Sequence, residues 1–149
     1  MDITFSGIIF IISLTYLYLY IKIRRERKFS EKAIYTNEVR RLIDLGFTGY
    51  VICVSEYHLL NCTYMMKKVY YFLSKERKVI IYKLPKDEMA IDFDITVIQD
   101  LKLKTTPSIC YISNGKTAEK QLLIQFIKGK NEMKSIIAGI HLLNRELAI

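Results

Sequence analysis

The amino-acid sequence predicts an α/β domain with a central mixed sheet flanked by helices, preceded by one N-terminal transmembrane helix. Three observations lead to this fold class. The stretch Ile3–Ile21 has no charged residue, helix-like and strand-like segments alternate along the rest of the chain, and Asn114-Gly115 stands between two apolar runs as a tight hairpin turn does. With 149 residues, 51% of them hydrophobic, the chain is long enough to bury the core of one domain.

The stretch Ile3–Ile21 is the predicted transmembrane helix. As a helix it is about 28 Å long, close to the roughly 30 Å of a bilayer core. Tyr16, Tyr18 and Tyr20 gather at its C-terminal end, where interfacial aromatic residues occur. No basic residue precedes the stretch and no small-x-small cleavage pattern follows it, which argues against a secretory signal peptide. A helix that is apolar on all faces either spans a membrane or is buried in a core, and the position of this stretch at the extreme N-terminus favours the membrane anchor.

The segment that follows, Lys22–Lys28, reads KIRRERK and is dominated by basic residues. Because only Asp2 carries a side-chain charge before the apolar stretch, the positive-inside rule predicts a cytosolic C-terminal domain. Three cysteines without a C-x-x-C pair agree with a reducing compartment. We expect residues 1–29 to form the anchor with its basic juxtamembrane segment, and residues 30–149 to form the domain. The basic segment suits anionic headgroups, and equally a plain stop-transfer signal.

The elements of the domain can be placed in order. Ser30–Leu45 predicts a helix, because it has a serine N-cap, apolar residues at helical spacing and a glycine directly after it. Tyr50–Ser55 is apolar on both faces, like a strand covered on both sides. Asn61–Lys75 predicts a helix with one apolar face. The remaining expected elements are strand Lys78–Leu84, helix Ile95–Leu101, strand Pro107–Ser113, strand Gln121–Ile127 and helix Glu132–Leu147.

The second half of the chain carries a family pattern. Ile98, Leu101 and Leu103 are followed by Pro107-Ser108, then by the Asn-Gly turn, and then by Gly129 after the last strand. With the element order, these spacings resemble the thioredoxin-like superfamily over roughly residues 33 to 147. The resemblance implies that the peptide bond before Pro107 is cis, whereas an unselected X-Pro bond is cis in only about 5–6% of cases.

The same resemblance locates the position of the family's redox motif, C-x-x-C, at the junction after Tyr50–Ser55. Cys62 falls on the second cysteine of that motif and Leu59 on the first. Cys53 falls on the strand position where the family often has a buried acid. Since the attacking thiol is missing, a dithiol exchange cycle is not expected. The resemblance therefore implies a redox-inactive domain.

A protein-binding or scaffolding role is the function that we predict. In the family, the surface between the junction and the cis-proline loop binds an extended peptide, with the backbone before the proline pairing as an added strand. Loss of the thiols removes turnover and leaves this groove in place. Its expected residues are Leu59, Leu60, Asn61, Cys62, Thr106 and Pro107.

Two alternatives stay open at the level of the sequence. The first is a monothiol oxidoreductase or redox sensor that uses Cys62, with His58 four residues earlier as a partner for the thiolate. The second is a virion or organelle membrane component whose domain serves assembly. The composition, rich in Ile, Lys and Tyr, is typical of an AT-rich genome such as that of a low-GC bacterium or a large DNA virus.

No cofactor, metal or nucleic acid is predicted. The cysteines together with His58 and His141 lack the close pair of ligands that holds a zinc ion, and no Gly-rich phosphate loop is present. The net charge of +8 is spread along the chain without the interleaved aromatics of a nucleic-acid surface. Tyr64, Tyr70 and Tyr71 are consistent with an amphipathic helix or with a patch for a partner.

Overall fold

The computed structural model describes residues 3–86, 92–123 and 132–147. Within these residues, five strands form one sheet in the order β1-β3-β2-β4-β5. The strands are β1 (Ala33–Ile34), β2 (Gly49–Val54), β3 (Val79–Lys83), β4 (Ser108–Ser113) and β5 (Lys116–Leu123). β1, β3 and β2 run parallel, whereas β4 is antiparallel to β2 and β5 is antiparallel to β4. The predicted mixed sheet is therefore confirmed.

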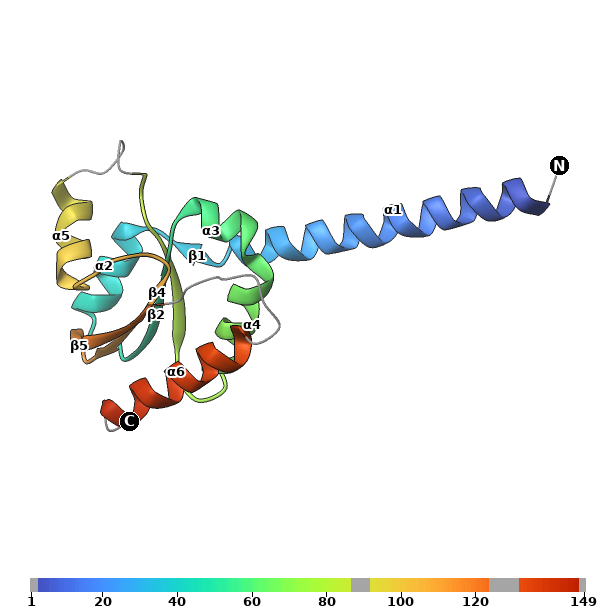
Figure 1. The fold of residues 1–149 in the computed structure, drawn as a ribbon. Coiled ribbons are helices and arrows are strands. Elements are labelled where there is room, and N and C mark those ends of the chain that lie inside the picture. The colour runs from blue at the N-terminus through green and yellow to red at the C-terminus, as the bar shows by residue number, and fades with distance from the viewer. Residues whose placement is uncertain (1–2, 87–91, 124–131, 148–149) are drawn as a thin grey trace.

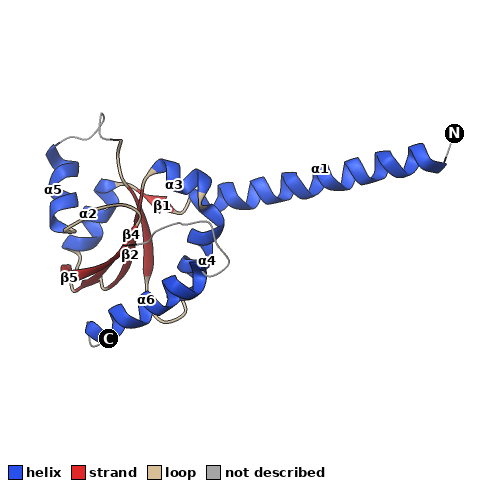
Figure 2. Cartoon of the chain, viewed as in Figure 1, coloured by secondary structure: helices blue, strands red, loops and turns tan. Residues whose placement is uncertain are grey.

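Helices cover both faces of this sheet (Figures 1 and 2). The end of α1 (Ile3–Ser30), α3 (Glu56–Asn61), α4 (Thr63–Leu73) and α6 (Glu132–Glu146) contribute to the core on one face. On the other face, α2 (Thr36–Asp44) and α5 (Asp92–Asp100) pack over a second core. The α/β architecture predicted from the sequence, a mixed sheet flanked by helices after an apolar N-terminal helix, is thus the observed one.

The central strand β2 explains why its sequence is apolar throughout. All six of its residues are buried. Because successive side chains point to opposite faces of a sheet, Tyr50 and Ile52 enter the core below α4 and α6, while Val51 and Cys53 enter the core below α2 and α5. A strand covered on both faces has no position for a polar side chain.

The predicted helix Ser30–Leu45 is wrong in its first part. α1 continues to Ser30, where the serine hydroxyl donates to the carbonyl oxygen of Arg27 at 2.8 Å and so closes one helix rather than opening another. The two residues of β1 then pair with β3. α2 begins only after Tyr35, whose backbone N–H donates to the Glu38 carboxylate at 3.1 Å.

The expected boundary between residues 29 and 30 thus falls inside α1. Phe29 is only 2% exposed and belongs to the domain's core, so the last turn of the N-terminal helix packs with the domain. Figure 1 shows the rest of α1 standing clear of the domain.

The predicted helix Asn61–Lys75 is in fact the end of one helix and the whole of another. α3 starts directly after β2, because the Ser55 side chain accepts a hydrogen bond from the His58 backbone N–H. Cys62, with φ −117° and ψ 18°, separates α3 from α4. The junction therefore holds one extra short helix.

The hairpin turn is where the sequence places it. Asn114 and Gly115 both have positive φ, 48° and 75°, as the turn between β4 and β5 requires. A Cβ atom on Gly115 would lie 2.5 Å from the Ile43 carbonyl oxygen, so glycine is needed there for space as well. β5 starts at Lys116, earlier than the expected Gln121; the expected end of this strand and Gly129 lie outside the described residues.

Candidate functional site

The candidate site lies at the carboxyl edge of the parallel part of the sheet. β1, β3 and β2 all end at this edge, and α2 and α3 start there. β4 runs in the opposite direction and starts there, so the loop before it reaches the same place. In open α/β sheets the carboxyl ends of parallel strands are where ligands bind.

The loop before β4 contains the expected cis proline. The Thr106–Pro107 peptide bond is cis, Pro107 is buried and Thr106 is half-buried. Since Ser108 pairs with Cys53, the next residue outward, Pro107, lies beside Val54 at the end of β2. Among the described residues, no backbone–backbone hydrogen bond involves Thr106. Thr106 therefore lies close to the carboxyl end of β2.

The two leucines of the junction have opposite surroundings. Leu59 is 4% exposed and packs in the core that contains Ile52 and Met66. Leu60 is 70% exposed on the outer side of α3. Asn61 is also exposed, and its side-chain amide donates to the Tyr57 carbonyl at 2.9 Å. Of the two leucines in the predicted groove, only Leu60 has an exposed side chain.

The surroundings of Cys62 and His58 bear on the alternative in which Cys62 acts as a single reactive thiol. Cys62 is half-buried at the bend between α3 and α4. The ring nitrogen Nδ1 of His58 lies 2.7 Å from the Ser55 hydroxyl, and partial burial lowers the pKa of His58 below its ordinary value. Burial thus favours the neutral imidazole, which lacks the positive charge that would stabilise a thiolate.

The other two cysteines face each other inside the core. The Sγ atoms of Cys53 and Cys110 are 3.9 Å apart, and both residues are buried and unbridged. The pKa of Cys53 is raised well above its ordinary value. Burial is the largest cause, and the contact with the Cys110 thiol is the second. At the position where the resemblance places a buried acid, this chain thus has a neutral thiol.

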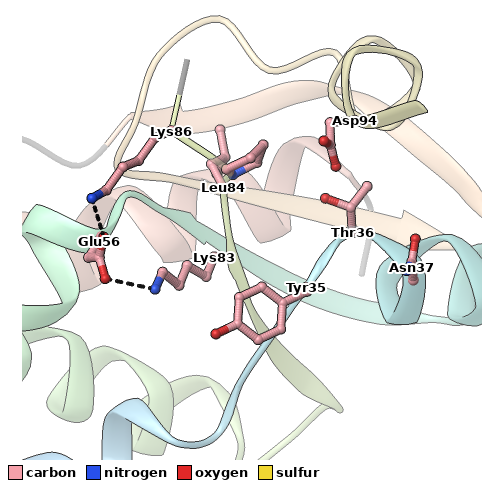
Figure 3. Close-up of a pocket in the computed structure, with 9 residues that line it drawn as sticks. Tyr35, Thr36, Asn37, Glu56, Lys83, Leu84, Lys86 and Asp94 are labelled. Atoms are coloured by element: carbon pink, nitrogen blue, oxygen red, sulfur yellow. Dashed lines mark hydrogen bonds and ion pairs between the residues drawn. The ribbon is translucent and has the colours of Figure 1, made fainter. Parts of the chain in front are cut away.

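A pocket that the sequence did not predict adjoins α3 at the same edge. It has a volume of about 500 Å³. In Figure 3, Lys83 and Lys86 reach the Glu56 carboxylate from two sides, and Asp94 faces Thr36 at the other end. The pocket is lined by Tyr35, Thr36, Asn37, Glu56, Lys83, Leu84, Pro85, Lys86 and Asp94. Most of these residues directly follow a strand end, which is the one signal in the sequence that could have located them.

Glu56 is the centre of charge in this pocket. Its carboxylate oxygens lie 3.0 Å from the Lys83 ammonium group and 3.3 Å from that of Lys86. Hydrogen bonds from these two lysines lower the pKa of Glu56. Lys83 also lies 5.7 Å from the centre of the Tyr35 ring. Because residues four apart are neighbours on a helix, Leu60 continues the surface one turn beyond Glu56.

The carboxyl edge brings together groups of several kinds. It combines a backbone segment at Thr106, an exposed leucine and a pocket with paired charges, whereas the chain has no C-x-x-C motif. Within the described ranges, no group of three His, Cys, Asp or Glu side chains could hold a metal ion.

Comparisons with known proteins add little to this picture. No family model matches the sequence, and no curated protein matches it. Among solved structures, the chain is similar to human ERp44 in its zinc-bound form, with a TM-score of 0.41 and 12% sequence identity. The likeness covers 73% of this chain and 31% of that one, so the chain spans about a third of that protein.

Proposed function

We propose that this chain is a single-pass membrane protein whose redox-inactive thioredoxin-like domain binds a segment of a partner protein at the carboxyl edge of its sheet. The observation that carries the proposal is Leu60, a 70% exposed leucine that directly follows the position of the family's attacking cysteine. An apolar side chain here has no structural role in the core, and it stands on the helix that begins beside the cis-proline loop.

The membrane part of the proposal rests on α1. Between Ser6 and Ser30 this helix contains a stretch that is apolar and long enough to cross a bilayer, and none of that stretch is buried by the domain. The hydroxyls of Ser13 and Thr15 donate to the carbonyls of Ile9 and Ile11, so both are satisfied within the helix. The basic segment Lys22–Lys28 supports a cytosolic domain.

The binding part rests on the chemistry of an extended peptide. Strand-type hydrogen bonds to the Thr106 backbone contribute about 0.5–1.5 kcal/mol each. Burial of the Leu60 side chain contributes about 1.5–3 kcal/mol. After the costs of association are subtracted, these terms support a weak to moderate complex. The neighbouring pocket at Glu56 offers charges of both signs to polar side chains of the same partner.

Dithiol catalysis has no support in the arrangement of the thiols. Cys62 is the one cysteine at the junction, and Cys53 and Cys110 are buried in the opposite core. A mixed disulfide formed at Cys62 would therefore have no neighbouring thiol within the domain to resolve it.

The test compares three leucines in the full chain within its native membranes. A photo-crosslinking amino acid at Asn61 reports a bound partner. Leu60→Asp should reduce the crosslinked product about tenfold or more, since a buried carboxylate without a partner is costly. Leu45→Asp is the matched control, because Leu45 is equally exposed but follows α2 on the other face of the sheet.

Thermal melts separate loss of binding from loss of fold. Leu60→Asp should melt like the unsubstituted chain, whereas Leu59→Asp should lower the melting temperature strongly because Leu59 is in the core. If Leu60→Asp leaves crosslinking unchanged, or unfolds the domain, the carboxyl edge is not the binding surface.

A further inference from the structure

The outer face of α4 is both basic and aromatic. Tyr64, Lys67, Lys68, Tyr71 and Lys75 follow one another at intervals of one, three or four residues, which places them along one side of the helix. Tyr64 is 63% exposed, Tyr71 is 48% exposed, and the lysines are exposed or half-buried. No acidic residue occurs from Thr63 to Lys75. We call these five residues the α4 face.

The side chains of the α4 face form one surface. All five line a single hollow, which Phe72 and Met133 complete. The Lys68 ammonium group lies 4.4 Å from the centre of the Tyr64 ring. Tyrosine and lysine each combine an apolar body with a polar end, the combination that residues at a membrane–water interface have. The opposite side of α4 packs in the core through Met66, Val69 and Leu73.

The end of α1 fixes where this face stands relative to a membrane. α1 is continuous to Ser30, and Phe29 packs in the core against α4. Figure 1 shows α4 crossing the base of α1, while α2 and α5 lie on the far side of the domain from α1. A rigid connection of this kind gives the domain one orientation, with the α4 layer toward the membrane.

The distance from the apolar stretch of α1 to the domain also suits a contact between the α4 face and the membrane surface. From Ile21, the end of the uncharged stretch, to Ser30 the helix rises about 13 Å. The headgroup region of one leaflet is roughly 5–8 Å thick, since a bilayer of about 40–45 Å has a core of about 30 Å. The domain therefore starts just beyond the headgroups, within reach of long side chains. The part of α1 between Ile21 and Ser30 carries the basic segment Lys22–Lys28.

We infer that the α4 face docks on the anionic headgroups of the leaflet from which α1 emerges. Its three lysines supply charge complementary to anionic lipids, and the rings of Tyr64 and Tyr71 enter the interface. The contact holds the domain against the membrane surface. This inference rests on the proposal that α1 spans the bilayer, and it does not involve Leu60 or the cis-proline loop.

The experiment uses the full chain reconstituted in vesicles of phosphatidylcholine alone, or of phosphatidylcholine with one third phosphatidylglycerol. A lysine-acetylating reagent is added on the side of the domain, and each lysine is followed by mass spectrometry. Phosphatidylglycerol should slow acetylation of Lys67, Lys68 and Lys75 about fivefold, and high salt should abolish the effect. Lys104 and Lys116, exposed elsewhere on the domain, should react at unchanged rates and are internal controls.

A pair of matched variants tests the tyrosines. Tyr64→Ser with Tyr71→Ser should weaken the protection of the three lysines, whereas Tyr35→Ser with Tyr57→Ser, which removes two exposed tyrosines outside the α4 face, should not. Equal acetylation rates in both kinds of vesicle would overturn the inference, because they leave no contact that depends on anionic lipid. Alkaline carbonate extraction separately tests the proposal that α1 spans the bilayer. If carbonate releases the chain, α1 does not span the bilayer, and that proposal and the docking inference both fail.

Discussion

The ring of Phe29, in the last turn of α1, meets the ring of Tyr70 on α4 edge to face, with the ring centres 5.7 Å apart and an angle of 79° between the planes. Phe29 is also part of the domain's larger core. The N-terminal helix is therefore not tied to the domain by a loose linker. Its final turn contributes to the stability of the domain.

Phe29→Ala should lower the free energy of unfolding of the domain by about 3–5 kcal/mol, the usual cost of removing a buried aromatic side chain. Denaturant unfolding of the full chain in detergent, followed by circular dichroism, measures this. Phe10→Ala is the control, because Phe10 is 64% exposed to its surroundings in the apolar part of α1. If both substitutions have the same small effect, Phe29 does not pack as described.

The three thiols should differ in reactivity. Cys62 is half-buried, whereas Cys53 and Cys110 are fully buried, and burial keeps the Cys53 thiol protonated. Because the thiolate is the nucleophile, a maleimide added to the folded chain should modify Cys62 alone. The other two should react only in denaturant. Mass spectrometry of the labelled peptides reports each site, and rapid native labelling of Cys110 would contradict the burial.

A disulfide-exchange assay should show no turnover. With insulin as substrate, the chain should be no more active than its Cys62→Ser variant, since a mixed disulfide at Cys62 has no resolving thiol within reach. Activity that is present in the chain and lost in Cys62→Ser would instead favour the monothiol enzyme.

The sequence predicted the fold well where one strand or turn carries its own signal. The apolar run of β2 and the Asn114-Gly115 turn determine their structures locally. β1 was missed because Ala33–Ile34 has no periodicity of its own, and its strand geometry comes from pairing with Ile81 and Tyr82 of β3. The start of α3 was missed because Ser55 looks like the end of a strand as much as a helix cap.

The candidate site was only partly predictable for a related reason. The junction and the cis-proline loop lie in positions that a family resemblance can supply. The opposite environments of Leu59 and Leu60 depend on where α3 begins and on the bend at Cys62, which periodicity does not give. The pocket at Glu56 needs the strand order, since β3 separates β1 from β2 and thereby brings Tyr35, Lys83 and Glu56 together.

The pKa of His58 should be lower in the folded chain than in the unfolded one. Partial burial disfavours the charged imidazolium, so the pKa falls below 6.5. At a pH between the pKa values of His58 in the folded and the unfolded chain, the unfolded chain binds more protons. The free energy of unfolding should therefore decrease as the pH falls below about 6.5. Nuclear magnetic resonance titration of the His58 ring in the folded and urea-unfolded chain measures both values. His58→Gln assigns the signal, and a folded value at or above the unfolded one would contradict the burial.

The orientation of the chain can be tested by moving charge. In intact cells, added protease should leave the domain undigested, because the positive-inside rule predicts that the basic residues after the apolar stretch keep it in the cytosol. The variant Arg24→Gln, Arg25→Gln, Lys28→Gln should expose a fraction of the chains, since it weakens the charge bias next to the helix. The control variant Arg41→Gln, Lys104→Gln, Lys116→Gln removes the same amount of positive charge, but Lys104 and Lys116 lie far from the helix in the sequence. Its domain should stay protected from the protease. Digestion of the unsubstituted chain without permeabilisation would place the domain outside the cytosol, and the reduced state of Cys53 and Cys110 would then need another cause.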